Sequence, residues 1–182
     1  MPLTDYNLSV LNILDPGFAA IVSIRNLPDV AVSYVDHAVA KDFGPLDMRI
    51  NRLKVMHKGF QDLPREVQHQ VVIDHVIPWY SQYLASWFNA AEKRDILFLR
   101  YEDVVFNTPE TLTIISDYLA KTALTTVFQS NENLKIAANF NKGESGRSRI
   151  FTSNQHLQLV WQAQIFRGYN NGLKLFDYLT QI

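Results

Sequence analysis

The sequence predicts an α/β protein in which a small parallel sheet is flanked by many helices. Two short apolar runs, at residues 18–24 and 95–101, are rich in the β-branched and aromatic residues that strands favour. The first run is almost continuously apolar, as expected for a parallel strand that is covered on both faces. Most of the remaining chain places apolar residues at helical spacing.

Length and composition narrow the possible functions. The chain has 182 residues, of which 47% are hydrophobic and 19% charged, so we expect one domain over residues 1–182 with a substantial core. The net charge of −1 gives no general attraction to nucleic acid or to an acidic membrane surface. The absence of cysteine excludes disulfides, zinc thiolate sites and cysteine nucleophiles.

The sequence also gives no indication of a membrane partner. It contains no run of about 20 apolar residues, which a membrane-spanning helix requires. Its first residues lack the basic and apolar regions of a signal peptide. We therefore expect a cytoplasmic protein.

The first half of the chain predicts a strand followed by helices. Residues 1–18 fit a short helix or an irregular arm, and the strand at 18–24 follows. Pro28 suits the first position of a helix that runs to about Lys41, because a proline there has no donor to lose. Three valines at helical spacing predict the buried stripe of this helix: Val32, Val35 and Val39.

A long helical stretch comes next. Residues 46–62 fit a helix that ends near Gly59, and Pro64 begins a longer one. Pro78 interrupts that stretch, so it forms either one kinked helix or two helices. An aromatic stripe follows that fits either core packing or the wall of an acceptor pocket: Trp79, Tyr83 and Trp87.

The second half predicts one more strand and further helices. After the strand at 95–101, Thr108 is suited to cap a helix that has Pro109 at its first position and ends near Ala120. A helix is also expected over residues 131–138. From about Asn154 the chain is helical, with a break at residues 168–172.

The sequence at residues 25–34 suggests a phosphate site. Arg25 stands where the first strand ends, and Ser33 follows about two turns into the next helix. Ligands bind at the carboxyl ends of parallel strands, and helix N-termini attract anions through free N–H groups. The planar guanidinium of arginine fits phosphate oxygens in pairs.

The same residues carry a family resemblance. The pattern Arg-Asn-x-x-Asp-Val-x-Val-Ser-Tyr resembles the 3′-phosphate-binding segment of the sulfotransferases that use 3′-phosphoadenylyl sulfate (PAPS). The resemblance implies that Arg25 and Ser33 hold the 3′-phosphate of this donor. The turn differs, because the family usually has proline at Leu27 and a basic residue at Pro28.

Two later segments continue the resemblance. The strand followed by Tyr101, Glu102 and Asp103 is similar to a family segment whose tyrosine borders the adenine and whose acidic residues organise structure. The loop at residues 141–152 resembles the family's glycine-rich basic loop, which implies that Lys142 and Gly143 contact the 3′-phosphate.

This loop also departs from the family pattern. Asn141 and Ser148 stand where the family has arginine and tryptophan. Arg147 or Arg149 could replace the lost charge, and we include Arg147 among the donor-binding candidates; the alternative is a basic loop exposed to solvent. Upstream, Asn131 occupies the place of a phenylalanine that stacks on adenine in the family.

The resemblance implies a fold and an activity. It implies a reduced form of the sulfotransferase-like, P-loop NTPase-like parallel sheet, with PAPS as donor, no metal, and a small hydroxyl or amine compound as acceptor. The loop that grips the 5′-phosphosulfate has no counterpart here, and no catalytic base can be named; among the histidines only His37 is tied to the site, four residues after Ser33. We expect that a second copy of the chain or an N-terminal segment missing from a truncated domain completes the sheet.

Two other functions remain open from the sequence. The chain could be a non-catalytic relative that binds a nucleotide or another protein. It could also be a mostly helical structural protein whose aromatic stripe binds a partner.

Overall fold

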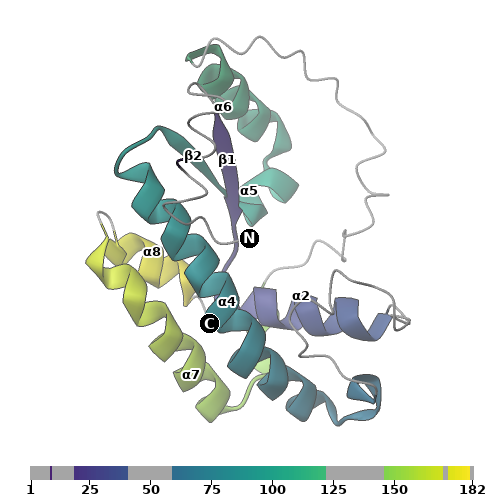
Figure 1. Ribbon diagram of the computed structural model, residues 1–182. Helices are drawn as coiled ribbons and strands as arrows, with labels where there is room; N and C mark the ends of the chain where they lie inside the picture. Colours follow the sequence, from purple (N-terminus) through teal and green to yellow (C-terminus); the bar gives the residue numbers. More distant parts are fainter. Residues whose placement is uncertain (1–8, 10–18, 41–58, 122–145, 170–171, 181–182) are drawn as a thin grey trace. The chain divides into compact units, whose positions relative to one another are not determined.

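A computed structural model describes Ser9 and residues 19–40, 59–121, 146–169 and 172–180 (Figure 1). The chain divides into two compact units. The first comprises Met1–Arg25 and Tyr83–Phe140, and the second Asn26–Gln82 and Asn141–Ile182. The arm expected at residues 1–18, the helix expected at 131–138 and most of the stretch at 46–62 lie outside the described residues.

The first unit contains a parallel sheet, as the sequence predicted. Strands β1 (Ala20–Ile24) and β2 (Ile96–Arg100) pair in parallel, with Ile24 opposite Arg100 at their carboxyl ends. The hydroxyl of Tyr118 joins their other ends, because it accepts from the Ala20 N–H at 3.2 Å and donates to the Asp95 carbonyl at 2.8 Å. Both strands therefore end at the same edge of the sheet.

Helices follow β2 directly. Helix α5 (Tyr101–Phe106) begins at the residue after the strand, and α6 (Thr108–Lys121) follows it. The rings of Phe88 and Phe98 stack with centroids 4.3 Å apart, which packs the last turns of helix α4 (Arg65–Ala91) on β2.

The expectation that β1 is covered on both faces was wrong. Its side chains alternate, with Val22 and Ile24 buried while Ile21 and Ser23 are exposed. Successive residues of a strand point to opposite faces. The face of β1 with Val22 and Ile24 is therefore packed against the rest of the protein. On the opposite face, Ile21 keeps 41% of its surface exposed.

The second unit is helical. Helix α2 (Leu27–Ala40) is followed by the short 3₁₀ helix η1 (Phe60–Asp62) and by α4 (Arg65–Ala91), whose residues up to Gln82 belong here. Pro78 lies inside α4, so the interrupted stretch is one helix.

Further along the chain, the second unit continues with η3 (Arg147–Ile150), α7 (Ser153–Ala163), η4 (Gln164–Gly168) and α8 (Gly172–Leu179). The end of η4 and the start of α8 confirm the predicted break at residues 168–172.

Three glutamines of α7 attach it to α4. The amides of Gln155 and Gln162 donate to carbonyls of α4, and Gln158 bonds to another glutamine. The pairs are Gln155 with Glu66 at 3.1 Å, Gln158 with Gln70 at 2.7 Å, and Gln162 with Ile73 at 2.9 Å. Residue numbers rise together along both helices, so α7 lies parallel to α4, as Figure 1 shows.

Some local predictions need correction. Pro28 is the second residue of α2, and Val39 is 37% exposed while Ala38 is buried. Thr108 does not cap α6, because its hydroxyl donates to the Val104 carbonyl at 2.8 Å, and it is itself the first residue of the helix. In the part of the chain that the structure describes, no helix is long and apolar enough to cross a membrane.

Candidate functional site

The parallel register brings Arg25 and Tyr101 together. Each residue directly follows its strand, and the paired strands end at Ile24 and Arg100. The guanidinium carbon of Arg25 lies 4.1 Å from the centroid of the Tyr101 ring. A cation over an aromatic face is stabilised by the ring quadrupole, so Tyr101 orients the guanidinium at the carboxyl edge of the sheet.

The start of α2 is capped by its own side chains. The Asn26 side-chain oxygen accepts from the Asp29 N–H at 2.8 Å, and the Asn26 side-chain amide donates to the Asp29 carboxylate at 3.0 Å. The Val30 N–H donates to the Asn26 carbonyl at 3.1 Å. This reciprocal arrangement resembles a capping box.

The capping changes how this helix end can bind an anion. Pro28 has no backbone N–H. The backbone N–H groups of Asp29 and Val30 already donate to oxygens of Asn26. Three of the first four backbone positions of α2 therefore offer no free donor. These three positions therefore do not fit the expectation that free N–H groups at this helix end attract a phosphate.

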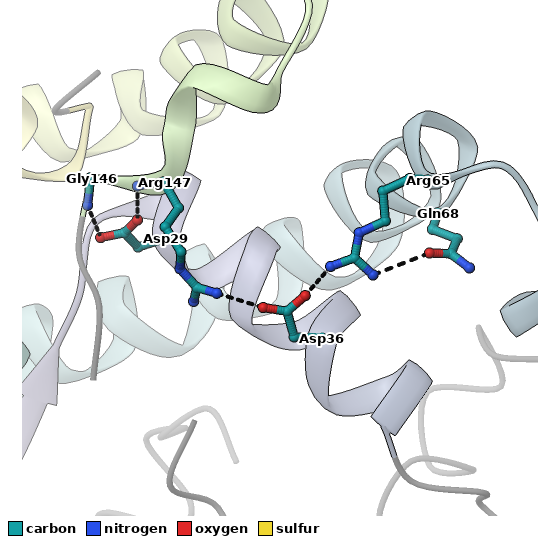
Figure 2. Close-up of polar contacts among 6 residues, drawn as sticks. All are labelled: Asp29, Asp36, Arg65, Gln68, Gly146 and Arg147. Atoms are coloured by element: carbon teal, nitrogen blue, oxygen red, sulfur yellow. Dashed lines mark hydrogen bonds and ion pairs between the residues drawn. The ribbon is translucent and has the colours of Figure 1, made fainter. Parts of the chain in front are cut away.

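The Asp29 carboxylate holds the segment that precedes α7. It is fully buried and accepts from the Gly146 N–H at 3.0 Å and from the Arg147 N–H at 3.1 Å (Figure 2). Gly146 has a φ of 75°, a left-handed conformation that glycine adopts without strain. One carboxylate thus fixes both the start of α2 and the loop that leads into η3.

A second carboxylate of α2, Asp36, holds two arginines. Asp36 forms ion pairs with Arg147 and with Arg65, which also donates to Gln68 at 3.3 Å (Figure 2). Gln68 in turn donates to the Phe60 carbonyl at 3.0 Å. The Arg147 side chain is therefore committed to Asp36 in this structure.

Ser33 lies on the face of α2 that carries these two acids. Residues 29, 33 and 36 share one face because they are three and four positions apart. Asp29 and Asp36 both contact Arg147, so this face of α2 meets the loop around Arg147. Ser33 is half-buried there.

The structure thus places the predicted site residues in two groups. Arg25 and Tyr101 lie together in the first unit, and Ser33 and Arg147 belong to neighbouring segments of the second. Lys142 and Gly143 lie outside the described residues, a few positions before Gly146. His37 is half-buried on α2.

A buried histidine lies beside the Asp36 cluster. His69 of α4 is 1% exposed, and its ring meets the edge of Phe151 with centroids 5.1 Å apart. Burial, together with the positive charge of Arg65, lowers the pKa of His69 to about 4, against an opposing effect of Asp36. His69 is therefore neutral at physiological pH.

Sequence reasoning missed the structural roles of Asp29 and Asp36. The Asn-x-x-Asp spacing at the start of α2 could have indicated the reciprocal cap. No motif near Asp29 indicated its hydrogen bonds with Gly146 and Arg147, because these residues lie 117 and 118 positions away in the sequence.

Comparisons with known proteins agree with the resemblance of the sequence motifs. Searches of curated proteins and of solved structures return no match to the chain. Among protein families, the sulfotransferase domain matches residues 5–158, which is most of the 182-residue chain and includes Arg25, Tyr101 and the loop around Arg147. The chain therefore belongs to the sulfotransferase family.

Proposed function

We propose that the chain binds PAPS as the donor for sulfuryl transfer to a small hydroxyl or amine compound. Sulfuryl transfer is the reaction that the sulfotransferase domain indicates. The observation that supports the donor most directly is Arg25, held over Tyr101 where β1 ends. Parallel strands place ligands at this edge, and the arginine fork matches two phosphate oxygens.

Each candidate residue has a distinct part in this proposal. Arg25 binds the 3′-phosphate as a charge-assisted pair of hydrogen bonds, and the Ser33 hydroxyl donates a further one. Tyr101 borders the adenine and keeps the guanidinium in position. Lys142 and Gly143 supply a cation and a close backbone approach from the glycine-rich loop.

Arg147 supports the donor site through its loop. Its backbone bond to Asp29 and its ion pair with Asp36 hold the segment that follows Lys142 and Gly143. The ion pair with Asp36 uses one guanidinium nitrogen of Arg147, so a contact between the phosphate and another nitrogen would keep that ion pair.

The transfer step needs groups that we do not assign. The acceptor oxygen or nitrogen forms a bond to sulfur while the bond from sulfur to the bridging oxygen of the 5′-phosphate breaks, which leaves adenosine 3′,5′-bisphosphate. A base removes the acceptor proton, and a cation stabilises the leaving oxygen. Without these groups the chain would be a nucleotide-binding relative that does not catalyse transfer, and this is the second candidate function.

The proposal extends to the architecture. We propose that β1 and β2 belong to a P-loop NTPase-like sheet within a single domain over residues 1–182. We also propose that a second copy of the chain or a further segment covers the exposed face of β1. Among the described residues, no cluster of three or more acidic or histidine side chains is placed to hold a metal ion, and the proposed donor contacts use none.

Calorimetric titration with adenosine 3′,5′-bisphosphate tests the donor. We expect Arg25→Ala to weaken binding by about 1.5–3 kcal/mol, because it removes a charge-assisted bidentate contact. Lys93→Ala, at an exposed cation of the same unit, is the charge-matched control and should bind like the wild type. No binding by the wild type would exclude PAPS as donor, and unchanged binding by Arg25→Ala would exclude the role of Arg25.

A further inference from the structure

The second unit contains a groove that the proposed donor site does not use. It has a volume of about 540 Å³ and lies between α4 and the segment formed by α7 and η4. Its walls are formed by nine side chains: Asp74, Pro78, Ser81, Gln82, Gln158, Trp161, Gln162, Gln164 and Ile165. None of the residues assigned to the donor is among them. This volume falls within the range of small-molecule sites, about 300–1,000 Å³.

The body of the groove is apolar and aromatic. Pro78 lies on one wall, and Trp161 and Ile165 lie on the other, where Trp161 keeps 75% of its surface exposed. A tryptophan left this exposed is unusual on a folded surface, because its indole could bury a large apolar area. The aromatic stripe expected to line an acceptor pocket, Trp79, Tyr83 and Trp87, is not part of this wall.

The polar groups of the groove include the Ser81 hydroxyl and the side chains of four glutamines, which can donate as well as accept. Pro78 cannot donate to the carbonyl of Asp74, which therefore loses its helical N–H partner. The Gln162 side-chain amide donates to the Ile73 carbonyl, and its oxygen is buried with no hydrogen-bond partner among the described residues. The Ser81 hydroxyl is likewise buried without a partner in the part of the chain that the structure describes.

The charged side chain that lines the groove is an acid. Asp74 is exposed and its carboxylate accepts from the Gln70 side-chain amide at 2.9 Å, while no lysine, arginine or histidine is among the lining residues. A site with one carboxylate, no cationic side chain and an exposed indole fits a ligand that carries a positive charge on an apolar body. An anion would meet the carboxylate and no cationic side chain among the lining residues.

We propose that this groove binds an organic amine in its protonated form. The ammonium group lies at Asp74, and the apolar body lies against Trp161 and Ile165. The proposal does not depend on the identity of the sulfuryl donor.

Fluorescence and calorimetric titrations with naphthalen-1-ylmethylamine test the proposal on the full chain. We expect saturable binding, with the corresponding alcohol weaker and 1-naphthoic acid without measurable affinity. Trp161→Ala and Asp74→Asn should each weaken binding of the amine by about tenfold, the loss expected for one aromatic contact or one charge-assisted bond. Raising the salt concentration should weaken binding to the wild type more than to Asp74→Asn.

Two variants serve as controls. Leu157→Ala changes another exposed apolar residue of α7, and Asp117→Asn changes an exposed acid of α6; neither residue lines the groove. Both should bind the amine like the wild type. Circular dichroism and binding of adenosine 3′,5′-bisphosphate, measured on every variant, separate loss of the groove from loss of the fold or of the donor site.

Two results would overturn the proposal. The first is absence of amine binding by the folded wild type, and the second is equal binding by the wild type, Trp161→Ala and Asp74→Asn. If the amine fails to bind and a wild-type dimer dissociates in Trp161→Ala, Trp161 and its neighbours belong instead to an interface between copies of the chain.

Discussion

At the residue scale, the contact between Arg25 and Tyr101 gives the donor site its most specific test. The guanidinium lies 4.1 Å from the ring centroid, and any aromatic ring would keep this interaction. Tyr101→Phe should therefore bind adenosine 3′,5′-bisphosphate almost like the wild type. Tyr101→Leu should weaken binding by about 0.5–2 kcal/mol, because the arginine loses its aromatic support.

Calorimetry on the two variants measures this difference. Equal weakening in both would mean that the tyrosine hydroxyl, and not the ring, matters for binding. Equal retention in both would mean that Arg25 does not depend on Tyr101.

Asp29 is the second residue for which the structure makes a sharp prediction. Its buried carboxylate accepts from Asn26, Gly146 and Arg147. Asp29→Asn replaces one acceptor oxygen with an amide that faces N–H donors, so the free energy of unfolding should fall by about 2–3 kcal/mol. Urea denaturation measures it, with Asp177→Asn, at an exposed acid of α8, as a control that should change little. Equal stability of Asp29→Asn and the wild type would show that this carboxylate does not hold the loop.

At the element scale, His69 of α4 should make the free energy of unfolding depend on pH. The pKa of His69 is lowered to about 4 in the folded chain, mainly by burial. The unfolded chain binds this proton at about pH 6.5. The contribution of neutral His69 to stability is therefore complete above pH 6.5 and is lost as the pH falls toward 4, by up to about 3 kcal/mol.

Urea denaturation across this pH range tests the prediction. His69→Phe keeps an apolar ring beside Phe151 and should flatten the decline in the free energy of unfolding between pH 6.5 and 4. His75→Gln changes an exposed histidine of the same helix and should leave the decline unchanged. A decline as steep in His69→Phe as in the wild type would assign the effect to other groups.

The elements also show what the sequence could and could not predict. Both strands were predictable from their apolar runs, and their parallel pairing places Arg25 beside Tyr101. The capping at Asn26 was missed although its spacing is visible. The hydrogen bond from Gly146 to Asp29 could not be predicted from the nearby sequence, because it depends on how distant segments pack. The glutamines of α7 that bond to α4 were missed for the same reason.

At the scale of the whole molecule, the sheet leaves apolar surface that the described residues do not cover. Strand β1 exposes 41% of Ile21 on the face opposite Val22 and Ile24. An exposed β-branched face on a short sheet favours association with another chain. We therefore expect the chain to dimerise or to be poorly soluble.

Multi-angle light scattering coupled to gel filtration tests this last prediction. The wild type should elute as a dimer or aggregate in a concentration-dependent way. Ile21→Glu should shift it toward a monomer, because a charge on this face disfavours burial against a second copy. Ile150→Glu changes an exposed isoleucine of the second unit and should leave the dimer intact. A stable wild-type monomer at high concentration would show that this face of β1 needs no second chain.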